Sequence, residues 1–255
     1  MSYAVAIRTA DGLVFAADSR TNAGPDHVSS FRKLHVFEKP GEKFIAAAIV
    51  GNLSLAQALV AELRGQDGRG RPKKGVDLLE AASMTDAARM TGQAIRALEA
   101  QDGGALSRHG VSFDVTVLIG GQIGKERPRL FQVYPAGNFI EAPDETPYLQ
   151  IGERKYGKAI LDQTVMLDST LGAAVRAAVL SMDATILNNA TVGWPADVLA
   201  LPRDQWRPGY FKRLEPGDAF VTELRRRWAD GVRDLITALP DPPGLARPAA
   251  RTLPR

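Results

Sequence analysis

The chain has 255 residues, enough for one large domain with a full core, and its 45% hydrophobic and 24% charged residues are ordinary for a soluble globular protein. The formal net charge is only +3, with basic residues spread among nearly as many acidic ones, so charge alone does not favour nucleic-acid binding. The absence of cysteine excludes disulfides, thiolate metal sites and a cysteine nucleophile.

The N-terminal segment does not have the pattern of a targeting sequence. Its first twenty residues lack the basic start and the unbroken apolar run of a signal peptide. No run of eighteen apolar residues occurs, so no membrane-spanning segment is predicted. We therefore expect a cytoplasmic protein without a membrane partner.

The first fifty residues predict two β-hairpins. The pair Asp11-Gly12 is typical of a tight hairpin turn, and Pro40-Gly41 marks a second turn. The last strand is almost wholly apolar, which is typical of a strand covered on both faces. The four predicted strands span residues 3–9, 13–17, 33–37 and 43–50.

Two helices are predicted next, with a loop between them. Leucines recur at helical spacing within residues 53–63, and residues 76–100 have the pattern of a long amphipathic helix. Gly103-Gly104 is expected to end that helix. The basic, glycine-rich stretch 65–75 is more typical of a loop than of a phosphate-binding or nucleic-acid element.

The second half of the chain predicts a run of strands followed by helices. The glycine-rich stretch 120–124 is interpreted as a turn rather than as a nucleotide-binding loop. After Trp194 the pattern weakens until the last helix. The strands are predicted at 114–119, 129–134, 139–141 and 148–151, and the helices at 156–161, 169–188 and 216–239.

This element order predicts an α+β fold in which two antiparallel sheets pack together and are covered by helices. No internal repeat or linker divides the chain, so residues 1–239 are predicted to form a single domain. The tail at 240–255 is rich in Pro and Arg, and we expect it to be flexible or packed on a neighbouring subunit.

Candidate catalytic chemistry gathers near the N-terminus. Removal of Met1 would leave Ser2 with a free α-amine beside its hydroxyl. The amine has a reference pKa near 8, which suits a general base at neutral pH, and an adjacent amine is a recognised activator of a hydroxyl nucleophile. Asp18, Lys33 and Gly51 each lie at a strand end, where local evidence alone favours a solvated charge or a simple turn over a functional role.

No pattern in the sequence indicates a metal or a cofactor. The three histidines, His27, His35 and His109, lack the spacing of metal ligands, and packing or surface positions are the favoured interpretation. We therefore predict that the protein uses neither a metal nor another cofactor.

Five sequence blocks resemble the proteasome β-subunit family, and most closely its bacterial Anbu branch, the ancestral β-subunit. The first and most specific block is SYAVAIRTADGLVFAADSRTNAG, and it is followed in the family's order by FRKLHVF, AIVGN, YLQIGERKYGKAIL and SMDATILNNATVGWP. Together the blocks span residues 2 to about 195. The resemblance implies an N-terminal-nucleophile (Ntn) hydrolase with a four-layer α-β-β-α sandwich.

The resemblance also implies roles for individual residues. Ser2 matches the nucleophile, Asp18 and Lys33 match an ion pair beside it, and Gly51 matches the glycine whose backbone N–H stabilises the oxyanion. Arg20 matches a basic residue with a supporting role. A cation at Lys33 would lower the pKa of the terminal amine and keep it neutral as a base.

The chain departs from the family pattern at several positions. It has Ser2 where many members have threonine, and Glu153 lies where true proteasomes have a serine-glycine pair. Asn189 and Val192 replace an acidic residue and a serine near the end of the long helix. Glu153 and Asn189 are therefore expected to occupy the supporting positions.

The leading hypothesis is hydrolysis of peptide amide bonds by Ser2 through an acyl-enzyme. Two alternatives stay open: an amidohydrolase or acyl transferase acting on a small amide metabolite, and a non-catalytic scaffold with the same fold. The resemblance implies self-association into a ring or helical homo-oligomer, and it does not indicate whether an ATPase partner is needed.

Overall fold

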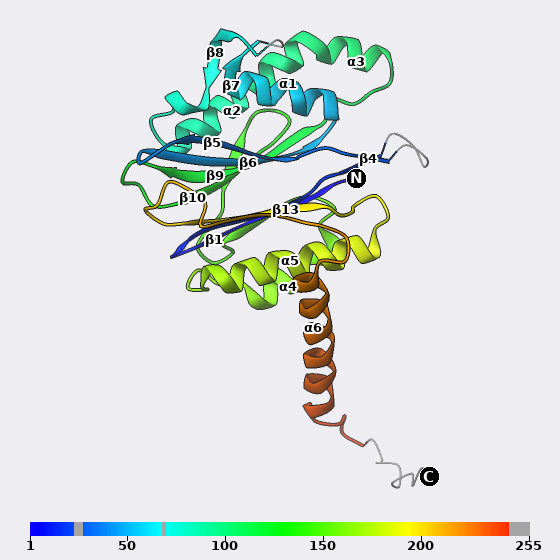
Figure 1. The fold of residues 1–255 in the computed structure, drawn as a ribbon. Helices are drawn as coiled ribbons and strands as arrows, with labels where there is room; N and C mark the ends of the chain where they lie inside the picture. Colours follow the sequence, from blue (N-terminus) through cyan, green and yellow to red (C-terminus); the bar gives the residue numbers. More distant parts are fainter. Residues whose placement is uncertain (23–27, 68–69, 245–255) are drawn as a thin grey trace.

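Two five-stranded antiparallel sheets lie face to face between two layers of helices (Figure 1). The computed structural model describes residues 1–22, 28–67 and 70–244. The first sheet, in the order β12-β1-β2-β13-β14, contains β1 (Tyr3–Thr9), β2 (Gly12–Asp18), β12 (Tyr148–Gly152), β13 (Ala196–Pro202) and β14 (Tyr210–Leu214). The second, in the order β11-β10-β9-β6-β5, contains β5 (Leu34–Lys39), β6 (Lys43–Gly51), β9 (Val115–Ile123), β10 (Arg129–Val133) and β11 (Phe139–Glu141).

The helices form one layer on the outer face of each sheet (Figure 1). The second sheet is covered by α1 (Leu53–Leu63) and α2 (Met84–Leu98), and α2 continues through a π-helical turn, η2 (Glu99–Gly103), into α3 (Gly104–Arg108). The first sheet is covered by α4 (Lys155–Thr164) and α5 (Leu171–Asn188), and α6 (Ala219–Ala238) follows β14. The short elements are β3 (Arg20–Asn22), β4 (Val28–Ser30), β7 (Arg64–Gln66), β8 (Pro72–Asp77) and the 3-10 helix η1 (Leu78–Glu80).

Three apolar clusters hold these four layers together. The central cluster fills the space between the two sheets and includes Phe15, Phe44 and Leu199. The other two lie between each sheet and its helices. All residues of β1 and β2 are buried, because both faces of the first sheet are covered. The predicted α+β fold with two antiparallel sheets and flanking helices is confirmed.

Both predicted hairpins are present, and they position the candidate residues. In the β1–β2 hairpin Thr9 pairs with Gly12, and in the β5–β6 hairpin Lys39 pairs with Lys43. The first strand therefore begins at the same edge of the sandwich at which β2 ends and β5 begins. Ser2 precedes β1, Asp18 ends β2, and Lys33 precedes β5, so the hairpin geometry brings the three positions to one edge.

Helix α6 leaves the lower helical layer and projects away from the sheets (Figure 1). Its base is attached to α5 by a two-bond ion pair from Arg225 to Asp183, at 2.7 and 2.6 Å. Val221 is the only residue of α6 that is buried. Helix α5 is long and apolar enough to span a membrane by length and composition alone, and half of it is buried in the fold.

Several predicted elements were wrong. Residues 65–75 do not form a simple loop, because β7 and β8 pair as a two-stranded ribbon across them. The predicted helix at 76–100 begins only at Met84, where the Ser83 hydroxyl accepts the N–H of Asp86 as an N-cap. Gly103-Gly104 does not end it, since the π-helical turn carries the chain on into α3.

The glycine-rich stretch 120–124 is also corrected, since most of it lies in β9 rather than in a turn. A Cβ at Gly121 would lie 2.1 Å from the carbonyl oxygen of Phe44 on the neighbouring strand, so glycine is needed there for close strand packing. Strands β13 and β14 were not predicted, although β13 pairs along the whole length of β2. Residues 245–255 of the predicted tail lie outside the described residues. The same is true of His27, for which a packing or surface position was predicted.

Candidate active site

The backbone around Ser2 is held by the end of β12. The carbonyl of Ser2 accepts a hydrogen bond from the N–H of Glu153 at 2.9 Å. Gly152 pairs with Tyr3 and has a φ of +81°, and a Cβ at Gly152 would lie 1.9 Å from the Ser2 carbonyl oxygen. Glycine thus lets β12 approach the chain start closely enough to fix the position of Ser2.

Asp18 connects the start of β1 with Lys33. Its Oδ1 accepts both the backbone N–H of Tyr3, at 3.0 Å, and the Nζ of Lys33, at 2.7 Å. The Asp18 side chain is fully buried, and that of Lys33 is only 9% exposed. Lys33 is held further by a 2.6 Å hydrogen bond from its Nζ to the carbonyl of Arg20. The ammonium group is therefore fixed beside the residue that follows Ser2.

Burial acts on both members of this ion pair. It raises the pKa of the Asp18 carboxyl and lowers the pKa of the Lys33 ammonium, while their mutual attraction opposes both changes. Arg20 supports the pair through its backbone carbonyl, and its side chain packs against Gly193, where a Cβ would lie 2.6 Å from the Arg20 Cδ. The predicted supporting residue therefore contacts Lys33 through its main chain.

Gly51 occupies a backbone conformation that a residue with a side chain would not tolerate. Its φ is +123°, and a Cβ there would lie 2.2 Å from the carbonyl oxygen of Asp114. The next residue, Asn52, caps α1 by accepting the N–H of Ser54, and its own N–H bonds the Asp114 carbonyl. Strand β6 thus ends in a tight turn directly before a helix N-terminus, where exposed N–H groups favour negative charge.

A cavity of about 450 Å³ brings Ser2, Lys33 and Gly51 together. Asp18 lies behind Lys33 and does not line it. The other residues of the wall come from the chain start, β3, β5, β6, α1, the end of β12 and the residues just before β5 and β9. They are Met1, Thr21, Arg32, His35, Ile49, Val50, Leu53, Ala56, Asp114 and Gly152.

Glu153 and Asn189 form a separate buried contact next to the Ser2 backbone. The Asn189 amide donates to the Glu153 carboxylate at 2.9 Å, and the backbone N–H of Lys155 donates to the other carboxylate oxygen at 3.2 Å. Val192 is buried in the cluster between the first sheet and its helices. The carboxylate-amide pair therefore lies where the chain departs from the proteasome pattern, and it includes Glu153, whose backbone N–H bonds the Ser2 carbonyl.

Three ionisable residues of the cavity wall were not predicted from the sequence as catalytic or supporting residues: Arg32, His35 and Asp114. Arg32 directly precedes Lys33, and His35 lies two residues after it. Because alternate residues of a strand point to the same side, the spacing from Lys33 is the signal that could have identified His35. Asp114 was predicted only as the start of a strand. Its position opposite Gly51 follows from the pairing of β6 with β9, which no local pattern reveals.

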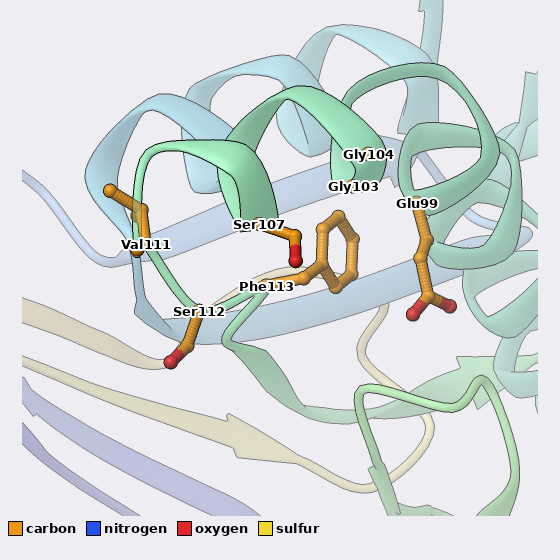
Figure 2. A pocket seen from close by; sticks show the side chains of 8 residues that line it. Glu99, Gly103, Gly104, Ser107, Val111, Ser112 and Phe113 are labelled. Atoms are coloured by element: carbon orange, nitrogen blue, oxygen red, sulfur yellow. The ribbon is translucent and has the colours of Figure 1, made fainter.

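A second hollow, of about 500 Å³, lies beside η2 and α3 (Figure 2). Figure 2 shows the Phe113 ring below the helical turn at Gly103 and Gly104, with the Ser107 and Glu99 side chains near it. None of the described residues that line this hollow has a basic side chain to pair with these hydroxyl and carboxyl groups. Among the described residues, no group of three or more His, Asp or Glu could hold a metal ion.

Comparison with known proteins identifies the family to which this fold belongs. Residues 78–201 match a family model described as a proteasome subunit. A solved Anbu mutant from Hyphomicrobium sp. strain MC1 is 40% identical over 94% of this chain and 99% of its own, with a TM-score of 0.85. The chain belongs to the Anbu family. The four-layer sandwich is thus the fold of a bacterial ancestral β-subunit.

Two further Anbu structures are similar over nearly the whole chain. The protein from Yersinia bercovieri is 41% identical, covering 94% of this chain and 98% of its own, with a TM-score of 0.84. An Anbu complex from Pseudomonas aeruginosa, described as a helical assembly, is 40% identical, covering 95% and 98%, with a TM-score of 0.85. No match was found among curated proteins.

Proposed function

We propose that this Anbu protein hydrolyses peptide amide bonds, with Ser2 as nucleophile after removal of Met1. The observation that carries the proposal is the shared Asp18 oxygen, which bonds both the backbone N–H of Tyr3 and the Lys33 ammonium. It places a fixed cation next to the residue whose amine would be the base. Met1 is 68% exposed and is followed by a small residue, so the bond to be cleaved is accessible.

In the proposed reaction the Ser2 hydroxyl oxygen attacks the substrate carbonyl carbon, and its proton moves to the α-amine of the same residue. The C–N bond of the tetrahedral intermediate then breaks, and the α-amine gives that proton to the leaving amine. Water next attacks the resulting ester, with the α-amine again accepting and returning a proton, and a carboxylic acid is released. The α-amine must be neutral to act, and the Lys33 cation favours its neutral form.

Gly51 is assigned the oxyanion site. It faces the same cavity as Ser2 and precedes the N-terminus of α1, so a backbone N–H there is suited to stabilise the negative oxygen of the intermediate. Removal of one such donor typically reduces the rate about a hundredfold or more. Glu153 and Asn189 are assigned a positioning role through the Ser2 carbonyl contact.

Intact-mass measurement of the purified protein tests this function first. We expect the protein to lack Met1 and to gain the mass of an electrophilic peptide probe, and Ser2→Ala to gain none. Retained Met1, or labelling that survives Ser2→Ala, would exclude the mechanism. Turnover of small amides without turnover of any peptide would favour an amidohydrolase or acyl transferase acting on a small metabolite. Turnover of neither small amides nor peptides would favour a non-catalytic scaffold.

We also propose that α6 is a contact between copies of the chain, consistent with the helical assembly of the Pseudomonas aeruginosa relative. The exposed part of α6 has an apolar stripe at helical spacing. The stripe consists of the half-buried Trp228, the exposed Val232, Leu235 and Ile236, and the exposed C-cap residue Leu239. The exposed fractions of Leu235, Ile236 and Leu239 are 61%, 64% and 54%, which is costly unless another surface covers them.

A complementary hollow lies at the base of the same helix. It has a volume of about 340 Å³, and α5 and α6 contribute Ala177, Leu180, Leu224 and Trp228 to its wall. A second copy in antiparallel contact could place its stripe against this hollow while offering its own hollow in return, as a twofold contact requires. Such a contact could build an extended assembly in combination with another interface.

Light scattering tests this contact. We expect the wild-type protein to be dimeric or larger, and Leu235→Glu to reduce its mass at the same concentration. Thr237→Glu is the matched control, since residue 237 is exposed on the opposite side of α6 and receives the same new charge. Equal masses for the wild type and Leu235→Glu would exclude the stripe as the interface.

A further inference from the structure

The cavity at Ser2 continues into an outer hollow of about 260 Å³ along α1. The two hollows share four residues, Arg32, His35, Leu53 and Ala56, and therefore form one cleft. Phe31 lines the outer hollow but not the cavity at Ser2. A substrate whose carbonyl lies between Ser2 and Gly51 can thus extend a side chain past Arg32 toward α1.

One wall of this cleft is apolar. Leu53, Ala56 and Val60 lie at i, i+3 and i+7 on α1, a spacing that places them on the same face of the helix. They present short aliphatic surfaces along the length of the outer hollow. This wall suits an unbranched methylene stem, which gains by leaving water but makes no polar contact.

The opposite wall carries the positive charge of Arg32. Its Nε lies 3.4 Å from Asp197, and its guanidinium lies 5.8 Å from the centre of the Phe211 ring. Asp197 is already paired by two hydrogen bonds with Arg213, at 3.0 and 3.1 Å. Two guanidinium groups thus share one carboxylate, and the Arg32 side chain, 54% exposed, carries the excess positive charge toward the cleft.

The other groups of the cleft do not cancel this charge. His35 is neutral at pH 7, because burial and the cations of Arg64 and Arg32 lower its pKa to about 4. Among the residues that the structure describes, none that lines the outer hollow carries a carboxylate, and Gln57 adds an amide that can donate. In the inner cavity Lys33 is balanced by Asp18, and the one lining carboxylate, Asp114, lies beside Gly51 rather than beside Arg32.

We propose that the preferred substrate carries a carboxylate on a short methylene stem at the residue whose carbonyl Ser2 attacks, as a glutamyl residue does. The stem packs on Leu53 and Ala56, and Arg32 binds the carboxylate. A guanidinium recognises a carboxylate through two parallel N–H bonds, which an uncharged amide of the same shape cannot match. This inference rests on the proposed role of Ser2 as nucleophile.

Four fluorogenic peptides that differ only in this residue test the proposal: Glu, the isosteric Gln, Lys and Leu. We expect kcat/KM of the wild-type protein to favour Glu over Gln by roughly tenfold or more. Arg32→Gln is expected to bring that ratio close to one, and Arg32→Glu to turn the preference toward Lys. Arg108→Gln, an exposed arginine on α3, is the matched control and should keep the wild-type ratio.

The outcomes separate this inference from the function on which it rests. Equal hydrolysis of the Glu and Gln peptides, lost in Ser2→Ala, would overturn the carboxylate preference and leave Ser2 as nucleophile. A Glu preference that Arg32→Gln leaves unchanged would overturn the role of Arg32. If no peptide is hydrolysed and no electrophilic probe labels Ser2, the proposed function itself fails. Arg32→Lys retains the charge without the paired N–H bonds and should keep an intermediate ratio.

Discussion

The Ser2 end of the sandwich and helix α6 both carry ion pairs, but in opposite surroundings. Lys33 and Asp18 are buried and share hydrogen bonds with the backbone, whereas the pairs of Arg226 and Arg227 with Glu223 on α6 lie in water. Removing one member of a buried ion pair leaves an uncompensated charge and strongly destabilises the fold, whereas removing one member of an exposed pair has little effect. A single chain can therefore fix the geometry at Ser2, while α6 offers an apolar stripe that only another surface can cover.

The largest effect is expected from breaking the buried pair. Lys33→Ala would leave the Asp18 carboxylate buried without its partner, which typically costs about 3–5 kcal/mol in the free energy of unfolding. Denaturant unfolding measures this loss, and labelling of Ser2 by an electrophilic probe should fall with it. Lys158→Ala removes a lysine from an exposed pair and is the control. Equal losses in the free energy of unfolding for Lys33→Ala and Lys158→Ala would contradict the difference between buried and exposed ion pairs.

Gly51→Ala is expected to have the next largest effect. The new Cβ would lie 2.2 Å from the Asp114 carbonyl oxygen, and alanine would have to adopt the positive φ of Gly51. We therefore expect the free energy of unfolding to fall by about 2–4 kcal/mol. We also expect acylation of Ser2 to become much slower, because the oxyanion site is displaced. Gly41→Ala is the matched control, since its φ is +74° but nothing lies within 4 Å of the new Cβ. We expect it to cost about 1 kcal/mol, with no change in acylation. A Gly51→Ala protein that acylates at the wild-type rate would remove Gly51 from the oxyanion site.

A pH effect of moderate size is expected at His35. Its pKa of about 4 in the folded chain lies below the unfolded value near 6.5, so the unfolded chain takes up the proton first as the pH falls. The stabilising effect of a neutral His35 is therefore complete above pH 6.5 and is lost as the pH falls toward 4. Between pH 7 and pH 4.5 the free energy of unfolding of the wild type should therefore fall by about 2 kcal/mol more than that of His35→Gln. Parallel pH profiles of unfolding for the two proteins would contradict a lowered pKa.

The smallest effect is expected on α6. Arg226→Ala removes two exposed ion pairs, to Glu223 and Asp230, and should leave the free energy of unfolding almost unchanged, because water screens both pairs. Thermal unfolding of the wild type and the variant under the same conditions measures it. A loss comparable with that of Lys33→Ala would show that the α6 pairs are held more tightly than exposed pairs are.

Much of the fold follows from local pattern. The hairpins at the chain start and the helix Leu53–Leu63 were predicted because turn residues and apolar spacing act over a few residues. Strand β13 was missed, since it is stabilised by pairing with β2, from Ala196 with Asp18 to Pro202 with Gly12, which lies far away in the sequence. The π-helical turn was missed because Gly103-Gly104 ordinarily marks a helix end.

The sequence predicted only those residues of the candidate site that are recognised by their position along the chain. Ser2, Asp18, Lys33 and Gly51 lie at strand ends near the N-terminus, and the family resemblance gave them roles. Arg32 and Asp114 could not be assigned in this way. Their places in the cavity depend on Asp197 and on the pairing of β6 with β9, both of which are contacts between distant parts of the chain.

The most direct test of the account is the mass of the N-terminal peptide after treatment of the purified protein with an electrophilic peptide probe. The account predicts a peptide that begins at Ser2 and carries one probe on that residue, and an unmodified peptide when Ser2→Ala is treated in the same way. A peptide that still begins with Met1, or a probe attached elsewhere in both proteins, would contradict it.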